Sequence, residues 1–461
     1  MLFKILAVKE GKEKNFYYDN SENYIYDEEG NILEFYKSNM FPSKEYTIFS
    51  KDVPLKKSKK VKTLKIQLGL TCNYSCEYCS QRFVPRAEET SRKNIESFLM
   101  KLDNLEFNEQ DGLRIELWGG EPLVYWKTIK PLVGAIKEKF SHWKRNPPQF
   151  SIITNGSLLT EEICDWMEQN CSGGAISHDG PGQSVRGPDP FDDEKKFNLI
   201  VSFYKKMEGK VSFNPMISYK NMSRKAVYEW FVDKIGNKDI KFGEGGFIDA
   251  YDIGGISNSL TTTEKDYLYR RSSFEELYND YTGNYYGFTI VSSKVNNFLN
   301  SVSAHLPAKT VMQKCGMDEE EVIAVDLLGN VLTCQNVSSV AINSNGEPHL
   351  GGNIENMSEV KITSSTHWTQ REECAGCPVL HICRGSCMYA SGEYWKQSCK
   401  NAFSDNVVFF ALAFEKLTKG YIPMYFEADG LPEERKNIWG EGEIRQEEPI
   451  SSKKKIKISV A

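Results

Sequence analysis

The sequence contains no long hydrophobic run and no excess of positive charge. No stretch approaches the roughly eighteen consecutive apolar residues that a membrane-spanning helix needs. Residues 1–10 alternate apolar and polar side chains as a strand does, and they lack the apolar core and small-residue cleavage site of a signal peptide. The formal net charge is −6, which argues against a general nucleic-acid binder. These absences predict a cytoplasmic protein that binds neither a membrane nor nucleic acid.

Twelve cysteines in 461 residues are the most informative part of the composition. The chain is too long for one ordinary core, so we expect two or more domains. Cytoplasmic proteins rarely contain disulfides, and these cysteines are clustered unevenly along the chain. The cysteine pattern therefore indicates metal binding.

Three of the cysteines, Cys72, Cys76 and Cys79, follow an apolar run that ends at Leu70. A structural zinc site uses four closing ligands, whereas the spacing C-x3-C-x2-C supplies three thiolates and leaves one coordination position empty. In a 4Fe-4S cluster, the fourth iron could then chelate a small molecule through an amine and a carboxylate. Half of a zinc site that is completed elsewhere is the alternative. The arrangement resembles the radical S-adenosylmethionine (SAM) enzymes.

Strand-like and helix-like segments alternate between residues 61 and 300, which is the pattern of parallel βα units. The expected strands are 64–70, 113–118, 150–153, 174–177, 211–217 and 240–248. The expected helices are 91–103, 127–140, 160–170, 192–207 and 224–235. Six such units resemble the α/β fold of radical SAM enzymes, a partial (β/α)6 TIM-like barrel. In such barrels ligands lie at the C-terminal ends of the strands.

Two strand ends carry short motifs that resemble those of the same family. The first is Gly119-Gly120-Glu121-Pro122, in which the glycines would let the backbone approach a ligand and Glu121 would accept from the SAM ammonium. The second is Thr154-Asn155-Gly156, where the resemblance implies contacts to the ribose and the methionyl part of SAM. Without the other motifs, a turn that begins a helix would explain the second equally well.

A third strand end, residues 177–181, reads Ser-His-Asp-Gly-Pro and is followed by Arg186. It resembles the Ser-x-Asp-Gly-Pro stretch of the branch that contains sulfatase maturases and peptide maturases. The resemblance implies that Ser177 lies near the ribose and that Arg186 binds the SAM carboxylate as a fork. It also implies that Tyr78, before the last cysteine of the first group, shields the cluster and packs near the adenine.

His178 departs from the apolar residue that this motif has between its Ser and Asp. With Asp179 it forms the candidate acid/base group for the substrate. The alternative is a hydrogen-bonded structural histidine, which is the commoner role of a lone histidine.

A second group of ordered cysteines lies beyond residue 300: Cys315, Cys334, Cys374, Cys377, Cys383, Cys387 and Cys399. Their spacing resembles the SPASM domain, which carries two auxiliary clusters. The resemblance assigns Cys374, Cys377, Cys383 and Cys399 to the outer cluster. It assigns Cys315, Cys334 and Cys387 to the inner one, which lacks a fourth cysteine. Either Asp318 or a nearby Glu is then an oxygen ligand of the inner cluster, or that cluster is open toward the substrate. Zinc in place of iron–sulfur clusters is the alternative for this domain.

The expected domains follow the changes of pattern along the chain. Residues 1–60 form a small N-terminal β unit and a linker, 61–300 the barrel, 301–405 the SPASM domain, and 406–461 a C-terminal helix and tail. The N-terminal strands could belong to the leader-binding winged-helix module of many peptide maturases. The stretch between residue 36 and the first barrel strand is short for the three helices of that module, which favours a truncated or unrelated β cap.

The resemblance implies reductive cleavage of SAM on the first of three 4Fe-4S clusters and hydrogen abstraction by a 5′-deoxyadenosyl radical. Two auxiliary clusters suit a net oxidation. The first hypothesis is therefore a maturase that installs a thioether, carbon–carbon or carbon–oxygen crosslink in a ribosomally made precursor peptide. The expected partners are that peptide, a flavodoxin- or ferredoxin-type reductant and, as an option, a separate leader-binding protein.

Two alternatives stay open. A sulfatase-type maturase would oxidise a protein Cys or Ser to formylglycine, but such enzymes carry an Asp, proposed as the base, where this chain has Gln335. An amide cannot act as a base, so this alternative is disfavoured. The other is a non-enzymatic metal or iron–sulfur scaffold or electron carrier, which would have no need of motifs for SAM.

Overall fold

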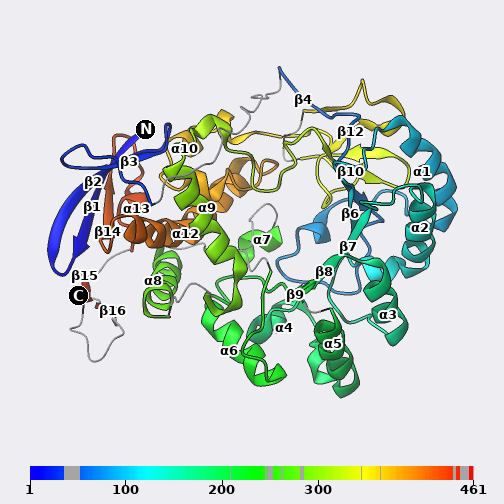
Figure 1. Ribbon diagram of the computed structural model, residues 1–461, viewed down its shortest axis with the longest axis horizontal. Coiled ribbons are helices and arrows are strands. Elements are labelled where there is room, and N and C mark those ends of the chain that lie inside the picture. The colour runs from blue at the N-terminus through cyan, green and yellow to red at the C-terminus, as the bar shows by residue number, and fades with distance from the viewer. Residues whose placement is uncertain are drawn as a thin grey trace.

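Two sheets at opposite ends of the molecule organise the fold of the computed structural model (Figure 1). The structure describes residues 1–35, 52–207, 209–243, 247, 253–260, 263–280, 285–343, 345–363, 365–439, 443–446 and 456–459. The larger sheet has eight strands in the order β12-β11-β10-β5-β6-β7-β8-β9, and the smaller has four in the order β14-β1-β2-β3. No helix within the described ranges is long and apolar enough to cross a membrane.

Five parallel strands form the barrel part of the larger sheet. They are β5 (Thr63–Gln67), β6 (Arg114–Trp118), β7 (Gln149–Thr154), β8 (Gly173–Ile176) and β9 (Val211–Phe213). Because side chains alternate between the two faces of a strand, Leu64 and Ile66 share one face while Lys65 and Gln67 share the other. Leu64 and Ile66 are fully buried in a core that includes Ile129 of α2. The second face is the concave side of the barrel, where polar side chains meet.

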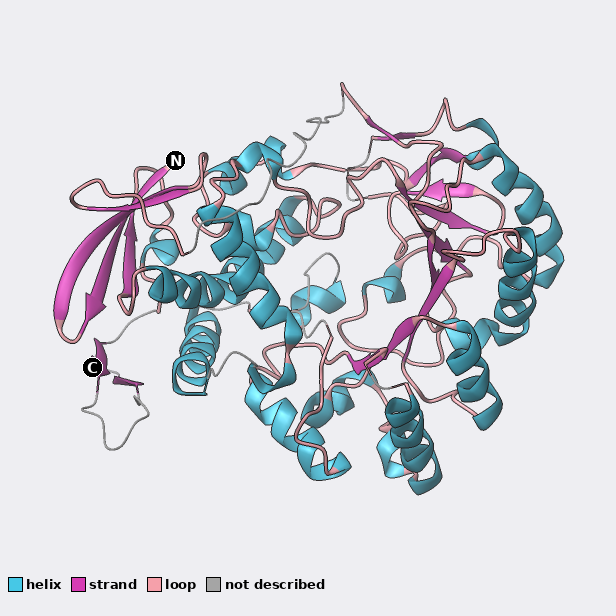
Figure 2. Cartoon of the chain, viewed as in Figure 1, coloured by secondary structure: helices cyan, strands magenta, loops and turns pink. Residues whose placement is uncertain are grey.

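The predicted helices lie on the outer side of this sheet (Figure 2). They are α1 (Ile95–Lys101), α2 (Trp126–Lys139), α3 (Glu161–Asn170), α5 (Glu194–Lys206) and α6 (Arg224–Ile235). The side chains of Thr160, Asp193 and Ser223 each accept a hydrogen bond from a backbone N–H in the first turn of α3, α5 and α6, respectively. Helix α6 ends at Gly236, whose φ of 72° is the left-handed conformation of a C-terminal cap.

The sixth strand of the predicted barrel differs from the expectation. Within 240–248, Phe242 and Phe247 make isolated parallel bridges to Phe213 and Ile217, and residues 244–246 and 248 lie outside the described part. The described barrel therefore has five parallel strands and these two bridges. Helices α4 (Gln183–Arg186) and α7 (Ile253–Ser257) complete this part of the chain, while α8 (Thr263–Asp280) and α9 (Thr289–Ser303) pack against α12 (Gly392–Leu417) (Figure 1).

The expected boundary at residue 300 does not separate two sheets. Strand β10 (Val322–Asp326) pairs in parallel with β5, and β11 (Asn330–Leu332) and β12 (Leu350–Asn353) extend the same sheet. Every residue of β10 is buried, as expected for a strand that is covered on both faces. The region that carries Cys334 is thus joined to the barrel through backbone hydrogen bonds.

The N-terminal strands form a sheet that a strand of the C-terminal region completes. Strands β1 (Leu2–Lys9), β2 (Lys12–Asp19) and β3 (Tyr24–Asp27) form a meander, and β14 (Ile422–Glu427) pairs antiparallel with β1. The sheet packs on α12 (Gly392–Leu417) through rings such as Phe16 and Phe414. The expected boundary at 405 falls inside α12, which already begins at Gly392. The last strand residue expected in this unit, Tyr36, lies outside the described part.

The end of the expected N-terminal region, residues 1–60, contains a short strand and a buried lysine. Strand β4 (Leu55–Lys56) pairs with β13 (Lys361–Ile362), and Lys57 is buried with its Nζ donating to the carbonyl oxygen atoms of Met317 at 2.7 Å and Glu319 at 2.8 Å. The other elements are α10 (Glu372–Ala375), α11 (Leu380–Cys383), α13 (Glu433–Lys436), β15 (Glu443–Gln446) and β16 (Ile456–Ser459).

Candidate active site

The loop that follows β5 brings the first three cysteines to one pocket. Cys72, Cys76 and Cys79 all line this pocket of about 350 Å³ at the C-terminal ends of the barrel strands. The backbone N–H of Tyr74 donates to Cys72 Sγ at 3.3 Å. Burial raises the pKa of Cys76 to about 12, so this thiol is neutral at neutral pH unless a metal binds it.

The predicted glycine motif packs directly against the cysteine loop. The backbone N–H of Gly120 donates to the Gly69 carbonyl at 3.1 Å, and that of Glu121 donates to the Thr71 carbonyl at 3.0 Å. A Cβ at Gly120 would lie 2.5 Å from the carbonyl oxygen of Leu70. The absence of a side chain thus lets this turn approach the loop that carries the cysteines. Gly119, Gly120, Glu121 and Pro122 all line the pocket.

Glu121 is buried and holds the next strand end. Its carboxylate accepts hydrogen bonds from Thr154 Oγ1 at 2.7 Å, from the Asn155 N–H at 2.7 Å and from the Leu123 N–H at 3.0 Å. Burial raises the pKa of Glu121. Thr154, Asn155 and Ser177 line the same pocket, as the motifs predict. The contact between Glu121 and the SAM ammonium stays a prediction.

Arg186 lies in the pocket with one donor unused. It is buried, and its Nη2 donates to Asp179 Oδ1 at 2.8 Å. Its Nε is also buried and has no hydrogen-bond partner among the described residues. The guanidinium lies 5.6 Å from the centre of the Tyr78 ring, which also lines the pocket. A guanidinium that is fixed in this way and has a free N–H fits a carboxylate ligand.

Asp179 orients other residues of the pocket and does not line it. Its Oδ1 accepts from Arg186 and from the Met216 N–H at 2.8 Å, and its Oδ2 accepts from the Tyr78 hydroxyl. The carboxylate is almost fully buried, with 1% of the residue exposed. Asp179 therefore positions Arg186 and Tyr78 and is not placed to exchange a proton with a substrate.

His178 likewise has a packing role in place of the acid/base role that the sequence suggests. Its Nδ1 accepts from the Gly180 N–H at 3.0 Å, and its Nε2 contacts Asp189 Oδ1 at 2.8 Å. The ring is fully buried against Phe191 and Trp230 and lines neither pocket of the site.

The donor set of the pocket fits a three-thiolate cluster together with SAM. Three thiols and an arginine with an unused donor line the same space. No three Cys, His, Asp or Glu side chains converge on a single metal ion anywhere in the described ranges. In a four-iron cluster each thiolate binds a different iron. Cys72, Cys76 and Cys79 would hold the cluster, and Arg186 the carboxylate of SAM.

A second cavity of about 820 Å³ adjoins the first and is lined by Cys315, Cys334 and Cys387. Both cavities are lined by Trp118 and Asn336, so they share a border. The backbone N–H of Asn336 donates to Cys334 Sγ at 3.4 Å. Burial raises the pKa of Cys334 to about 12. The three cysteines that the sequence assigns to an inner cluster thus face one cavity beside the SAM pocket.

A charged pair on the concave face of the barrel lines the second cavity. Lys65 Nζ lies 3.4 Å from Glu116 Oε2, and Trp118 Nε1 donates to the same oxygen at 2.9 Å. Lys65 and Glu116 line the cavity, and Glu116 Oε1 has no hydrogen-bond partner among the described residues. No motif in the sequence identifies this pair; polar residues at alternating positions of two otherwise apolar strands are the signal that could have found it.

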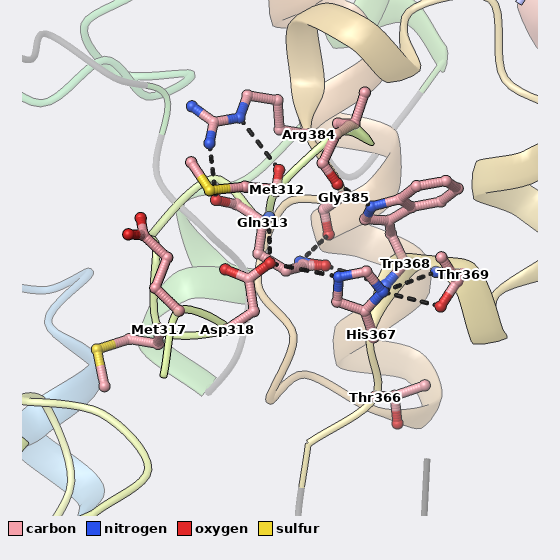
Figure 3. Close-up of polar contacts among 12 residues, drawn as sticks. Met312, Gln313, Met317, Asp318, Thr366, His367, Trp368, Thr369, Arg384 and Gly385 are labelled. Carbon is pink, nitrogen blue, oxygen red and sulfur yellow. Dashed lines mark hydrogen bonds and ion pairs between the residues drawn. The ribbon is translucent and has the colours of Figure 1, made fainter. Parts of the chain in front are cut away.

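Asp318, a candidate ligand of the inner cluster, is held by two neighbours (Figure 3). Its Oδ2 accepts from the Gln313 N–H at 2.8 Å and lies 3.4 Å from His367 Nε2. These contacts lower its pKa despite burial. Its Oδ1 is buried and has no hydrogen-bond partner among the described residues. One carboxylate oxygen of Asp318 is therefore uncommitted, and its role as a ligand stays a prediction.

The four cysteines assigned to an outer cluster gather in one place. Burial, followed by the neighbouring Cys383, Cys399 and Cys377, raises the pKa of Cys374. The elements that carry them are α10, α11 and α12 and their connections. Four thiols that lie this close to one another fit a site that is closed by four thiolates.

The comparisons with known proteins agree with this geometry. Residues 66–187, from β5 to the end of α4, match the Radical SAM superfamily. Over 354 residues the chain is 23% identical to the radical SAM cyclopropyl synthase TigE of Paramaledivibacter caminithermalis, a match that covers 72% of this chain and 68% of that protein.

Two further matches cover different extents of the chain. It is 27% identical to the serine-type anaerobic sulfatase-maturating enzyme of Bacteroides thetaiotaomicron over 167 residues, or 35% of this chain and 36% of that protein. The solved structure of native anSMEcpe with bound AdoMet and Cp18Cys peptide has a TM-score of 0.54 and 20% identity, and covers 78% of this chain and 98% of that chain. The likeness to anSMEcpe shows that this chain and that protein share a fold.

Proposed function

The chain is an enzyme with a radical SAM domain, and from this premise we propose that it is a maturase that oxidatively forms a new bond within a ribosomally made peptide. The observation that carries the proposal is the adjacency of the two cavities. One holds the three-cysteine loop and Arg186, and the other is large enough for a peptide segment and is lined by Cys315, Cys334 and Cys387.

Three 4Fe-4S clusters are part of this proposal. With SAM bound, the first would supply a 5′-deoxyadenosyl radical that abstracts hydrogen from a substrate carbon. The chain's own residues orient SAM through Arg186, and Asp179 fixes Arg186 in turn. The buried walls of the pocket would keep water from the radical.

Formation of the new bond requires that the substrate radical lose one electron and that the substrate lose one proton. Cys315, Cys334 and Cys387 would hold an iron–sulfur cluster that, in its oxidised state, would supply the electron acceptor. We propose that Glu116 is the base that accepts this proton. One of its carboxylate oxygens is held by Trp118 and Lys65, and the other has no partner among the described residues that line the cavity. Gln335, next to Cys334, cannot serve as a base because it is an amide.

The relatives bear on the kind of bond. One is named a cyclopropyl synthase, and cyclopropane formation creates a carbon–carbon bond. The other is named a serine-type sulfatase-maturating enzyme, and Gln335 disfavours that reaction here. Carbon–carbon bond formation is therefore the first reaction to test.

The test is an anaerobic assay of reconstituted protein with SAM, dithionite and synthetic peptides that match the short reading frames beside its gene. We expect about twelve iron atoms per chain, formation of 5′-deoxyadenosine, and a peptide product lighter by two hydrogen atoms. A variant with Cys72, Cys76 and Cys79 all replaced by Ala should make neither product. Zinc in place of iron, with no SAM cleavage, would refute the proposal.

A further inference from the structure

The C-terminal region returns to the second group of cysteines and places an arginine against two of them. Arg435, in α13, is 8% exposed. Its Nη2 donates to Cys399 Sγ at 2.9 Å. Burial raises the pKa of Cys377, and the positive charge of Arg435 and a side-chain hydrogen bond from it oppose that shift. Both cysteines belong to the set assigned to the outer cluster.

Arg435 is held from several sides. Its Nη1 donates to the Glu373 carbonyl at 3.4 Å, next to Cys374, and its guanidinium lies 5.2 Å from the centre of the Phe403 ring on α12. The backbone on either side of it is anchored as well, because Arg270 Nη1 donates to the carbonyl oxygens of Glu434 at 3.1 Å and Asn437 at 3.2 Å. These contacts fix the guanidinium at the thiols.

A second arginine near the same cysteines differs in its bonding. Arg371 donates through Nη2 to the Ala390 carbonyl at 2.8 Å and through Nε to the Thr366 carbonyl at 3.2 Å, and it stacks on Trp395 at 3.5 Å from the ring centre. The hydrogen bonds of Arg371 go to backbone carbonyls, whereas Arg435 also bonds to sulfur. The two arginines therefore contribute differently to the site.

We propose that Arg435 raises the reduction potential of the outer 4Fe-4S cluster. Reduction adds one electron, from a low-potential donor such as dithionite, and makes the cluster more negative. A buried positive charge and N–H···S hydrogen bonds stabilise that state more than the oxidised one. A higher potential would make the outer cluster a better acceptor for an electron that the cluster at the inner cysteines passes on. This inference rests on the proposed function, because the function supplies the cluster.

The experiment is a redox titration, followed by electron paramagnetic resonance, of the full chain in the background with Cys72, Cys76 and Cys79 replaced by Ala, which leaves the two auxiliary clusters. We expect R435Q to lower the ratio of reduced to oxidised outer cluster about tenfold at a given potential, which is about 59 mV for one electron. R435K, which keeps the positive charge, should lower the reduction potential less. The neighbouring Lys436 is half-buried and pairs with Glu433 at 2.7 Å, and the variant K436Q should leave the potential unchanged.

Iron content separates the outcomes. If this background binds about four iron atoms or none, in place of the expected eight or so, the clusters of the proposed function are refuted, and this inference with them. If eight are bound and R435Q titrates as the parent does, Arg435 does not tune the cluster, while the proposed function stands. If R435Q and R435K both lose one cluster, the role of Arg435 is structural and the inference is overturned.

Discussion

A Cβ built on Gly120 would lie 2.6 Å from the carbonyl oxygen of Thr71, because the turn after β6 packs against the cysteine loop. We therefore expect Gly120→Ala to displace the loop that carries Cys72. Overpacking of this kind costs about 1–3 kcal/mol of folding free energy. The larger effect should be on the site, with reduced iron incorporation and at least tenfold slower SAM cleavage.

Gly134 provides the matched control, since a Cβ there would meet nothing within 4 Å. It lies inside α2, where Ala is favoured over Gly by up to about 1 kcal/mol. Gly134→Ala should thus keep the iron content and slightly raise the free energy of unfolding in urea. Equal iron content and activity in the two variants would contradict the role given to Gly120.

His178 should matter for stability and not for proton transfer. His178→Gln disturbs the contacts with the Gly180 N–H and Asp189, so we expect a loss of about 1–3 kcal/mol in the free energy of unfolding. The pH profile of SAM cleavage by the folded variant should match that of the wild type. An altered profile without loss of stability would restore the acid/base role.

The barrel and its motifs were predictable because they depend on local signals. The helices α2, α3 and α6 lie within a residue or so of their expected bounds, since apolar spacing and capping residues mark them. The pairing of β14 with β1 could not be predicted, because the two strands are separated by almost the whole chain. The burial of Lys57 could not be predicted either, because a lysine is usually solvated, whereas its Nζ donates to the carbonyl groups of Met317 and Glu319.

Within the site, too, local sequence signals were predictable and tertiary contacts were not. Residues of the motifs line one pocket, but the motifs do not reveal that Asp179 points at Arg186 and Tyr78. The direction of a side chain depends on tertiary packing, and a sequence motif contains no information about that packing. Arg435 was missed for a similar reason, since only the fold brings the C-terminal region to Cys399.

Replacing Glu116 by Gln should separate SAM cleavage from product formation. The amide keeps the shape of the side chain but cannot take a proton, so we expect a hundredfold or greater loss of peptide product. Formation of 5′-deoxyadenosine with the same peptide should stay within about twofold, because Glu116 does not line the SAM pocket.

The control for this variant is Glu162→Gln, which removes a surface carboxylate that pairs with Lys130. It should leave both products unchanged. Wild-type yields of the peptide product from Glu116→Gln would exclude Glu116 as the base, and loss of SAM cleavage in that variant would indicate a structural role.

His349 should make the folded protein sensitive to mild acid. The residue lines the second cavity but is only 7% exposed, and burial lowers its pKa to about 4. In the unfolded chain its pKa is about 6.5. The unfolded state therefore binds more protons between these values. The stability that the neutral ring contributes is present above pH 6.5 and is lost as the pH falls toward 4.

His349→Gln removes this titration while keeping a side chain that can bond to Thr333, whose Oγ1 lies 2.7 Å from Nδ1 in the wild type. We expect the wild type to be the more stable protein at pH 7.5, and this advantage to shrink by up to about 3 kcal/mol by pH 4. Urea unfolding of both proteins across this range measures the difference directly. The exposed His142, replaced by Gln in the same way, controls for the loss of a histidine. The difference in free energy of unfolding between wild type and His349→Gln depends on pH only if the pKa of His349 changes on folding. A difference that stays constant with pH would therefore show that burial does not hold His349 neutral.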